Sequence, residues 1–387
     1  MATRFWINEI KFNDDTTLQL EKDDVVVFVG PNNAGKSASL KEMVALLKAK
    51  AQKGKIIKDI TIEKEGEEIE LFTLLNKSTS KSYDNQRRIF YQGLGFGIWD
   101  FQAKNVFSNY ANGIEELLSL FANILTTEQR LQAANPAQNI KLTTQTKQHP
   151  IHFLQEDDTL EMRFSDYFRQ AFGTDLIVHR NAGSEVPLYI GEKPKIENGE
   201  DRVSSTYLRK LEKLDLLHEQ GDGMRSFVGV LLYTFISRHS ILFIDEPEAF
   251  LHPPQARLLG KMLVKDIPSE RQLFLATHSE DFLKGLLDAN TNKLKIIRIQ
   301  RDGSINRINS LISSDIKSVW NDSLLRHSNV LNGLFHSKVV ICESDSDCRF
   351  FSAVLSARFD NTSSIAPDIL FIHCGGKHRI PTAIKAL

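Results

Sequence analysis

Residues 24–37 read DVVVFVGPNNAGKS, and this stretch decides the fold. Its β-branched apolar start predicts a strand buried on both faces. The following Gly30–Ser37 matches the pattern GxxxxGKS, in which glycines let backbone N–H groups turn toward phosphate oxygens. The lysine then reaches the β- and γ-phosphates and the serine holds Mg²⁺. An incidental glycine-rich turn is the alternative, but the strand before the loop and the helix expected after it favour an ATP site with Mg²⁺. The candidate ATP-binding residues are Gly30, Asn32, Asn33, Ala34, Gly35, Lys36 and Ser37.

A second apolar run, ILFID, delivers two adjacent carboxylates, Asp245 and Glu246, to its carboxyl end. Ligands of parallel sheets bind at that edge. We expect Asp245 to position the magnesium ion through water and Glu246 to orient and deprotonate the attacking water. The next apolar run ends in ATHS, which places His278 to touch the γ-phosphate. A histidine at a strand end is by itself more often structural, but its position after Asp245 and Glu246 favours a catalytic role.

The remaining pattern predicts an α/β fold. From residue 240 to residue 299 strands and helices alternate, which indicates a parallel sheet covered by helices. We expect a buried thiol at each of the three cysteines, because their number is odd and no CxxC pair occurs. The other expected elements are a strand at 4–12, a β-hairpin at 56–75, helix at 103–135, a loop at 134–148, helices at 160–172 and 205–217, and strands at 176–179 and 186–190.

Composition adds few constraints on partners. The 387 residues carry a net charge of −1, so contact with nucleic acid would depend on local basic patches. Candidates are Lys50, Lys53, Lys55, Arg87 and Arg88, although each is more often a solvated surface residue. No apolar run is long enough to span a membrane, and the first residues lack a signal-peptide pattern. We therefore expect a cytoplasmic protein with no membrane partner.

The segments GPNNAGKS, IDEPEAFLHPPQ and ATHS, separated by a long insertion, resemble the ABC/SMC-type ATPases of the OLD (overcoming lysogenization defect) group. The resemblance implies that two heads bind ATP between them, with a signature segment of one capping the nucleotide of the other. Here the matching segment is Gln220–Ser226, with Gly221, Gly223 and Arg225 as candidate ATP contacts. It departs from the usual motif, with Gly221 in place of serine and Asp222 in place of glycine, and a glycine-rich helix start is the alternative. Glu248 and His252 match the EPExxLHP extension of the group, for which helix capping is an equal alternative.

The C-terminal stretch KVVICE, followed by SDSD, resembles the start of a TOPRIM domain, a metal-dependent nuclease and topoisomerase module. Glu343 and Asp347 lie four residues apart, so both carboxylates can face one Mg²⁺. Ser344 replaces the usual glycine, and the remaining Asp-x-Asp ligands are expected beyond Leu387, which predicts that the chain as given lacks nuclease activity or is truncated. An ordinary βαβ unit with a solvated acidic turn is the alternative.

Taken together, these observations predict an ABC-type P-loop ATPase head at 1–310 with a helical insertion at about 100–220. A connector at 311–335 and the first part of a TOPRIM domain at 336–387 follow. The resemblance implies an ATPase that controls a nuclease in antiviral defence. We expect the nuclease to act on nucleic acid, and DNA is the expected target. The resemblance also implies a homodimer or higher homo-oligomer formed through the ATPase heads. A partner subunit of a defence complex is a further expected partner. The competing hypothesis is an ATP-dependent nucleic-acid sensor or scaffold without nuclease activity.

Overall fold

A six-stranded sheet forms the centre of the protein, in a computed structural model that describes residues 3–50, 54–93, 96–197, 199–303, 305–311, 313–359 and 367–387. The strand order is β17-β16-β3-β15-β14-β8. All neighbours are parallel except β16 and β17, which pair antiparallel. The strands are β3 (Val25–Val29), β8 (Ala122–Leu125), β14 (Ile241–Asp245), β15 (Gln272–Ala276), β16 (Leu294–Asp302) and β17 (Ile305–Leu311). The predicted α/β class and the alternation between residues 240 and 299 are confirmed.

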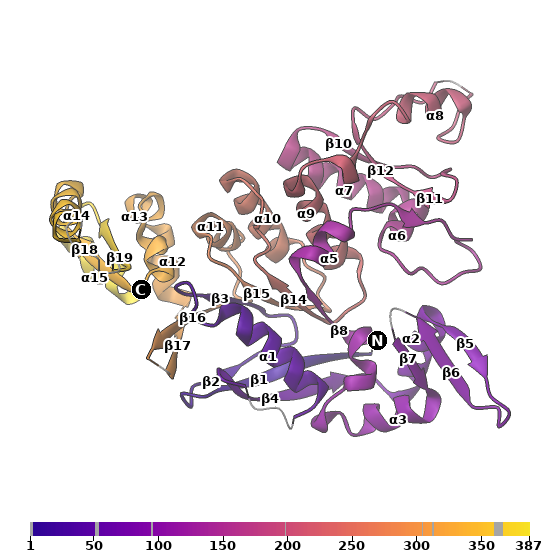
Figure 1. Ribbon diagram of the computed structural model, residues 1–387, viewed down its shortest axis with the longest axis horizontal. Coiled ribbons are helices and arrows are strands. Elements are labelled where there is room, and N and C mark those ends of the chain that lie inside the picture. Colours follow the sequence, from indigo (N-terminus) through magenta and orange to yellow (C-terminus); the bar gives the residue numbers. More distant parts are fainter. Residues whose placement is uncertain are drawn as a thin grey trace.

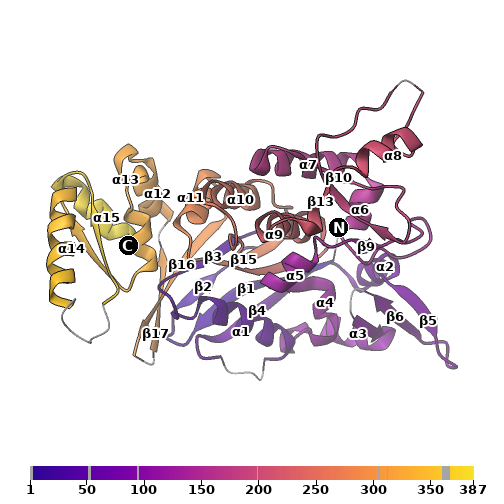
Figure 2. The ribbon, with the colours of Figure 1, turned by 45° about the horizontal axis from the view of Figure 1, so that its top comes forward.

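Layers cover both faces of this sheet (Figure 1). All five residues of β3 are buried, with Val25, Val27 and Val29 in one apolar core and Val26 and Phe28 in the other. One face carries α1 (Lys36–Lys48), seen in indigo below the sheet, and the other carries helices above it (Figures 1 and 2). These helices are α9 (Asp222–Leu231), α10 (Pro253–Lys265) and α11 (Glu280–Asp288). The buried apolar run of β3 thus accounts for its central place in a two-sided sheet.

An antiparallel sheet, ordered β2-β1-β4, packs on the α1 side. Its strands are β1 (Arg4–Phe12), β2 (Thr17–Gln19) and β4 (Ile57–Glu65). The hairpin predicted at 56–75 is wrong in its second half, which forms α2 (Glu68–Ser78). Glu67 and Glu70 form a reciprocal capping box, and Leu71 and Leu75 are buried one helical turn apart. The cap and this i,i+4 pair favour helix over the second strand.

The helix predicted across 103–135 is wrong over most of that range. Helix α3 (Asp100–Ser108) ends before Gly113, whose φ is 122° and whose added Cβ would lie 2.2 Å from the Lys48 carbonyl oxygen. Further on, β8 pairs with β14, so sheet pairing overrides the local helical spacing. A lower lobe, below the sheet in Figure 1, also contains β5 (Ser80–Tyr83), β6 (Ile89–Gly93), β7 (Phe96–Trp99), η1 (Tyr110–Asn112), η2 (Glu115–Leu117) and α4 (Leu118–Phe121). Helix α5 (Thr127–Gln132) follows β8 and packs beside α9 on the other face of the sheet.

An upper lobe follows β8 and α5 in the chain (Figure 1). It contains β9 (Ala137–Gln138), α6 (Ile151–Glu156), α7 (Asp158–Phe172), β10 (Asp175–Val178), β11 (Glu185–Val186), β12 (Leu188–Gly191), α8 (Ser205–Leu211), β13 (Asp215–Leu216) and η3 (Leu217–Glu219). The loop at 134–148 is confirmed apart from β9, as are the helix at 160–172 and the strand at 176–179. Pro187, which has no N–H, separates β11 from β12, and the helix predicted at 205–217 ends early at Leu211. A short η4 (Leu232–Ile236) then continues α9 toward β14.

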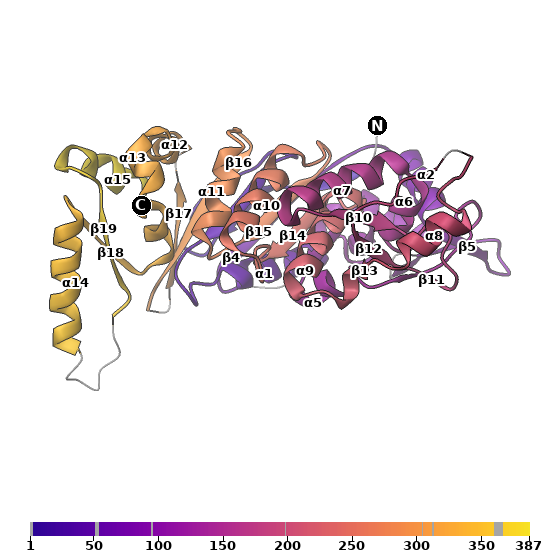
Figure 3. The same ribbon diagram turned by 90° about the horizontal axis from the view of Figure 1, so that it is seen from above.

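The C-terminal part lies at the opposite end of the molecule, in yellow (Figures 1 and 3). It is reached through α12 (Ser313–Asn321), α13 (Ser323–His327) and η5 (Val330–Phe335). Strands β18 (Lys338–Cys342) and β19 (Ile369–His373) pair in parallel, with α14 (Asp345–Phe359) between them, so the predicted βαβ unit is confirmed. The chain then forms η6 (Lys377–Arg379) and α15 (Ile380–Ala386). The three cysteines are free and buried, as predicted.

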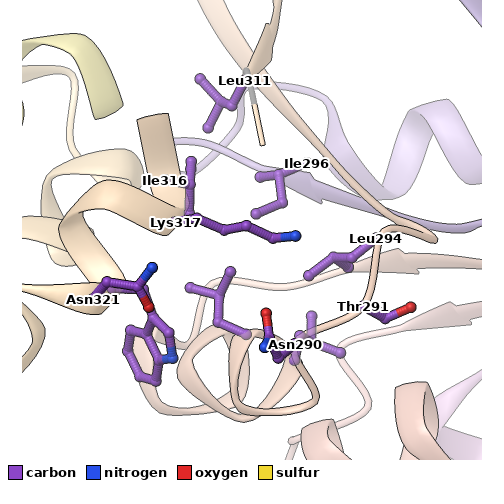
Figure 4. Close-up of a pocket in the computed structure, with 11 residues that line it drawn as sticks. Asn290, Thr291, Leu294, Ile296, Leu311, Ile316, Lys317 and Asn321 are labelled. Carbon is purple, nitrogen blue, oxygen red and sulfur yellow. The ribbon is translucent and has the colours of Figure 1, made fainter. Parts of the chain in front are cut away.

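The C-terminal part is docked on the central sheet. Helix α12 lies beside β16 and β17 around a cavity of about 30 Å³, large enough for little more than a water molecule (Figure 4). The buried guanidinium of Arg298 on β16 donates hydrogen bonds to the carbonyl oxygens of Gly333 (3.2 Å), His336 (3.1 Å) and Leu387. In the sheet Arg298 pairs with Val29, the residue before Gly30. One buried cation thus joins the sheet beside the Gly30–Ser37 loop to the C-terminal part.

No helix in the described ranges combines the length and apolar character that crossing a membrane requires. Among the basic residues considered for nucleic-acid contact, Lys53 lies outside the described residues. Two others have nearby acidic partners, Lys50 with Asp59 at 3.8 Å and Arg88 with Asp84 at 2.7 Å. These pairs fit the solvated-surface interpretation of both residues.

Candidate active site

The loop between β3 and α1 is shaped by residues with left-handed backbone angles. The φ angles are 148° at Gly30, 61° at Asn33 and 106° at Gly35. A Cβ at Gly30 would lie 2.1 Å from the main-chain oxygen of Ile299, so only glycine fits there. The loop therefore runs directly into the N-terminus of α1, where free N–H groups favour an anion.

The ammonium of Lys36 points back into this loop. Its Nζ donates hydrogen bonds to the carbonyl oxygens of Gly30 (2.7 Å) and Pro31 (2.9 Å). The residue is only 8% exposed, and burial lowers the pKa of Lys36, while the nearby carboxylates of Glu246 and Asp245 raise it. The two carboxylates thus favour the charged ammonium form of Lys36, which lies where the negative charge of a triphosphate would bind.

Ser37 and Asp245 meet across the sheet edge. The Ser37 hydroxyl donates a hydrogen bond of 2.8 Å to Oδ1 of Asp245, although 208 positions separate the two residues. Burial raises the pKa of Asp245, and the hydrogen bond from Ser37 opposes that rise. A hydroxyl and a carboxylate at one point are the oxygen ligands that Mg²⁺ prefers, so the residues present fit this ion.

Glu246 follows β14 in a strained conformation. Its φ is 48°, and its N–H donates a hydrogen bond of 2.8 Å to the carbonyl oxygen of Ala276. The side chain lies 3.2 Å from Nδ1 of His278, and both side chains remain about half exposed, at 45% and 50%. The structure thus places the predicted base and the predicted histidine together at the open side of the site.

Glu248 lies beneath this pair. Its Oε1 accepts hydrogen bonds from the Thr277 hydroxyl (2.6 Å) and from the His278 N–H (3.3 Å), while Nδ1 of His278 lies 3.7 Å away. Its Oε2 is buried and has no hydrogen-bond partner among the described residues, and burial raises the pKa of the Glu248 carboxyl group. Glu248 therefore supports the segment that carries His278. His252, in contrast, is the N-cap residue of α10, as the capping alternative predicts.

Sequence reasoning missed Arg130, on α5. This side chain is fully buried, and its guanidinium donates hydrogen bonds to the main-chain carbonyls of Asp245 (3.1 Å) and Glu246 (2.6 Å) and to the Thr127 hydroxyl (2.9 Å). Burial lowers the pKa of Arg130, and the carboxylate of Glu248 has the largest opposing effect. No signal marked this residue, because a single arginine within a segment predicted as helix resembles any surface cation.

Residues 129–283, which include α5, β14 and β15, match the family model described as "AAA domain, putative AbiEii toxin, Type IV TA system". A protein of Methanocaldococcus jannaschii described as "Uncharacterized protein MJECL11" is 34% identical over 97 residues, which make up 24% of this chain and 84% of that protein. The chain belongs to the family of MJECL11. The AAA-domain match and the assembled phosphate loop mark it as a P-loop ATPase.

Solved structures of SMC heads are also similar to this ATPase. An SmcHead bound to the C-winged helix domain of ScpA is 12% identical, with 81% of this chain and 99% of that chain covered and a TM-score of 0.47. The SMC head domain from Thermotoga maritima is 13% identical, with 81% and 100% covered and a TM-score of 0.39.

The segment predicted to be the signature, Gln220–Ser226, leads into the N-terminus of α9. Gly221 is the N-cap residue and its helix start has no side-chain cap, while Arg225 bonds to Asp222 (3.1 Å) and to the Leu131 carbonyl (3.4 Å). A Cβ at Gly223 would lie 2.8 Å from the Phe250 main-chain oxygen. Within the described residues, no hydrogen bond joins the three candidate residues Gly221, Gly223 and Arg225 to the phosphate loop of the same chain.

The two C-terminal candidates lie at the start of α14 and the end of β18. Oδ2 of Asp347 accepts hydrogen bonds from the Ser344 N–H (3.1 Å) and hydroxyl (2.8 Å), so this carboxylate stabilises the turn. Glu343 is exposed, and its carbonyl oxygen accepts a hydrogen bond from the Gly376 N–H (3.0 Å). In the part of the chain that the structure describes, no group of three or more His, Cys, Asp or Glu side chains is arranged to hold a metal ion.

Proposed function

We propose that this ATPase binds ATP with Mg²⁺ between the phosphate loop and the ends of β14 and β15, and hydrolyses it there. The hydrogen bond between Ser37 and Asp245 carries this proposal, because it joins the two halves of the site. Backbone N–H groups of the loop and the Lys36 ammonium bind the phosphates. The loop residues concerned are Gly30, Asn32, Asn33, Ala34, Gly35 and Ser37.

Ser37 and Asp245 would hold the magnesium ion, Asp245 through water, and the bound ion would neutralise charge on the phosphates. Glu246 orients and deprotonates the attacking water, since its carboxylate is half exposed and lies beside His278. His278 contacts the γ-phosphate and is supported from below by Glu248. In this proposal Glu246 acts on the water, His278 contacts the γ-phosphate, and Ser37 and Asp245 hold the magnesium ion.

A second copy of the chain completes the site in this proposal. The N-terminus of α9 has no side-chain cap, and among the described residues the N–H groups of Asp222 and Gly223 have no hydrogen-bond partner, so these two are free to bind an anion. Gly221, Gly223 and Arg225 would contact the nucleotide of the partner head, which makes the working unit a homodimer or a higher homo-oligomer. In the described residues no hydrogen bond ties these three to their own phosphate loop, although Arg225 would have to exchange its bonds to Asp222 and the Leu131 carbonyl for that contact.

We further propose that the ATPase, at residues 1–310, controls a TOPRIM nuclease that begins at 336–387, as in the OLD group. The parallel βαβ unit supports this, as do the position of Glu343 directly after β18 and the connector at 311–335 docked through Arg298. Glu343 and Asp347 would be the first magnesium ligands of that domain. In this proposal the nuclease cleaves nucleic acid, and we favour DNA as its target. The protein acts in antiviral defence in the cytoplasm, and a further protein subunit can be part of the working complex. Free buried thiols fit a reducing compartment.

A second candidate function is an ATP-dependent nucleic-acid sensor or scaffold that does not cleave. The engagement of Asp347 by Ser344 favours it, because that carboxylate already has partners in the turn. Measuring ATP hydrolysis, and separately Mg²⁺-dependent cleavage of DNA, in the natural full-length protein distinguishes the two. Hydrolysis without cleavage supports the sensor, and cleavage that depends on Glu343 supports the nuclease.

A further inference from the structure

A large cleft lies on the side of the ATPase away from the C-terminal part. Its volume is about 1220 Å³, above the ~300–1,000 Å³ of ordinary small-molecule sites. The lower lobe contributes the β5–β7 sheet, the segment before α6 contributes residues 142–150, and the turn after η4 closes the cleft beside β8. These lobes flank the right-hand side of the molecule in Figure 1.

Among the described residues that line the cleft, none carries a carboxylate. Of the 387 residues in the chain 49 are acidic, so 28 lining residues would be expected to include three or four, but none is Asp or Glu. Three cations line the cleft, namely Lys77, Lys147 and Arg238. Lys147 pairs with Glu156 outside the lining. Arg238 donates a hydrogen bond to the neutral Ser78 hydroxyl (2.8 Å) and lies over the Phe153 ring at 5.6 Å, and among the described residues it has no acidic partner. The cleft therefore offers positive charge in a chain with a net charge of −1.

Aromatic rings and amides accompany these cations. Phe90 and Phe96, from β6 and β7, are partly buried at the cleft wall. Gln92 lies between them in the chain with its side chain exposed, and Asn123 of β8 lies on the other wall. Rings stack on bases, and amides can bond to base edges that are not paired.

We propose that this cleft binds a short single-stranded segment of nucleic acid. Phosphodiesters would lie against Lys77, Lys147 and Arg238, and bases would stack on Phe90 and Phe96. A duplex keeps its bases stacked inside and presents phosphates outside, so it could not use the rings and amides of the cleft. The inference rests on the proposed nucleic-acid partner and gives it a site apart from the C-terminal part.

The position of the cleft also places the strand next to the catalytic machinery. Gln129, on α5, lines the cleft, and its neighbour Arg130 holds the main chain of Asp245 and Glu246. One short helix thus borders both the proposed strand and the ATP site.

Fluorescence anisotropy with a fluorescein-labelled 12-nucleotide single strand tests the inference on the full chain. Lys77→Ala/Arg238→Ala should weaken binding roughly tenfold or more at low salt. It should also reduce the slope of log K against log salt by about 1.4, as two lost phosphate contacts predict. Lys58→Ala/Lys210→Ala is the matched control, because it removes two cations outside the cleft, and its affinity should stay within about twofold.

Gln92→Glu provides a second variant that should leave the fold intact, because the side chain is exposed and the change adds only one negative charge to the cleft. This variant should bind the single strand several-fold more weakly than the wild type. Equal binding by the wild type, the cleft double variant and Gln92→Glu would overturn the proposal, as would no binding of the single strand or preference for a matched duplex. ATP hydrolysis measured on the same preparations distinguishes failure of the cleft proposal from failure of the proposed ATPase function. Intact hydrolysis without binding of the single strand rejects the cleft proposal and leaves the ATPase proposal standing.

Discussion

The guanidinium of Arg130 donates a 2.6 Å hydrogen bond to the main-chain oxygen of Glu246, the proposed base. Glu246 is held at a φ of 48°, a conformation that costs of order 1–3 kcal/mol for a non-glycine residue. Arg130 also bonds to the Asp245 carbonyl, so one buried side chain positions both acidic residues. It acts through the backbone and is thus a positioning residue.

Arg130→Lys should lower kcat for ATP hydrolysis by about tenfold or more, because an ammonium cannot hold two carbonyls with the fork of a guanidinium. ATP affinity, measured separately with a fluorescent nucleotide, should change little, since the phosphate loop is untouched. Arg225→Lys, at the signature segment, is a useful comparison because it should affect the paired heads rather than the isolated site. Unchanged kcat in Arg130→Lys would remove the positioning role.

Glu246→Gln should bind ATP but hydrolyse it at least about 100-fold more slowly, because the amide cannot accept the proton of the attacking water. Trapped ATP should then hold two heads together. Light scattering after size-exclusion chromatography with ATP should show a species of at least twice the monomer mass. Addition of Lys36→Ala to this variant should abolish the larger species, and a species that forms without nucleotide would contradict ATP-dependent pairing.

Burial of Glu248 makes stability depend on pH. Its pKa is raised in the folded state from an ordinary value of 4.5, so the folded protein disfavours the charged carboxylate. The protonated form contributes its full stability below pH 4.5, and that stability is lost as pH rises through the raised folded pKa. The Tm of the wild type relative to Glu248→Gln should therefore fall as pH rises above 4.5. A difference that stays constant or grows would show that burial does not control this carboxyl group.

Glu343→Ala in the natural full-length protein should abolish Mg²⁺-dependent cleavage of DNA and leave ATP hydrolysis within about twofold, because the residue lies apart from the ATP site. Asp345→Ala is the matched control, since Asp345 is an exposed neighbouring carboxylate paired with Arg349 and should be dispensable. A gel-based nuclease assay gives the readout. Cleavage that survives Glu343→Ala would reject the TOPRIM assignment.

Much of the ATP site could be predicted from the sequence, because neighbouring residues in the chain mark each of its groups. Each group follows a buried parallel strand, and parallel strands end at one edge, so the contact of Ser37 with Asp245 could be anticipated. The mutual position of Glu246 and His278 follows from the same rule, since β14 and β15 are neighbours.

The failures have equally specific causes. Residues 103–135 show helical spacing, but β8 gains its hydrogen bonds from β14, more than a hundred residues away, and no local pattern contains that partner. Arg130 was missed for the same reason, because the main-chain oxygens that it binds, those of Asp245 and Glu246, also lie more than a hundred residues away. The helix in the second half of 56–75 could have been predicted, since Glu67 and Glu70 have the spacing of a capping box.

Steady-state ATP hydrolysis by Lys36→Ala, compared with the wild type and with Lys48→Ala, tests the central claim most directly. Lys48 is an exposed lysine at the end of the same helix, so it controls for loss of charge on α1. We predict at least about a 100-fold loss of hydrolysis for Lys36→Ala and wild-type activity for Lys48→Ala. Wild-type hydrolysis by Lys36→Ala would contradict the assignment of the phosphate loop as the ATP site.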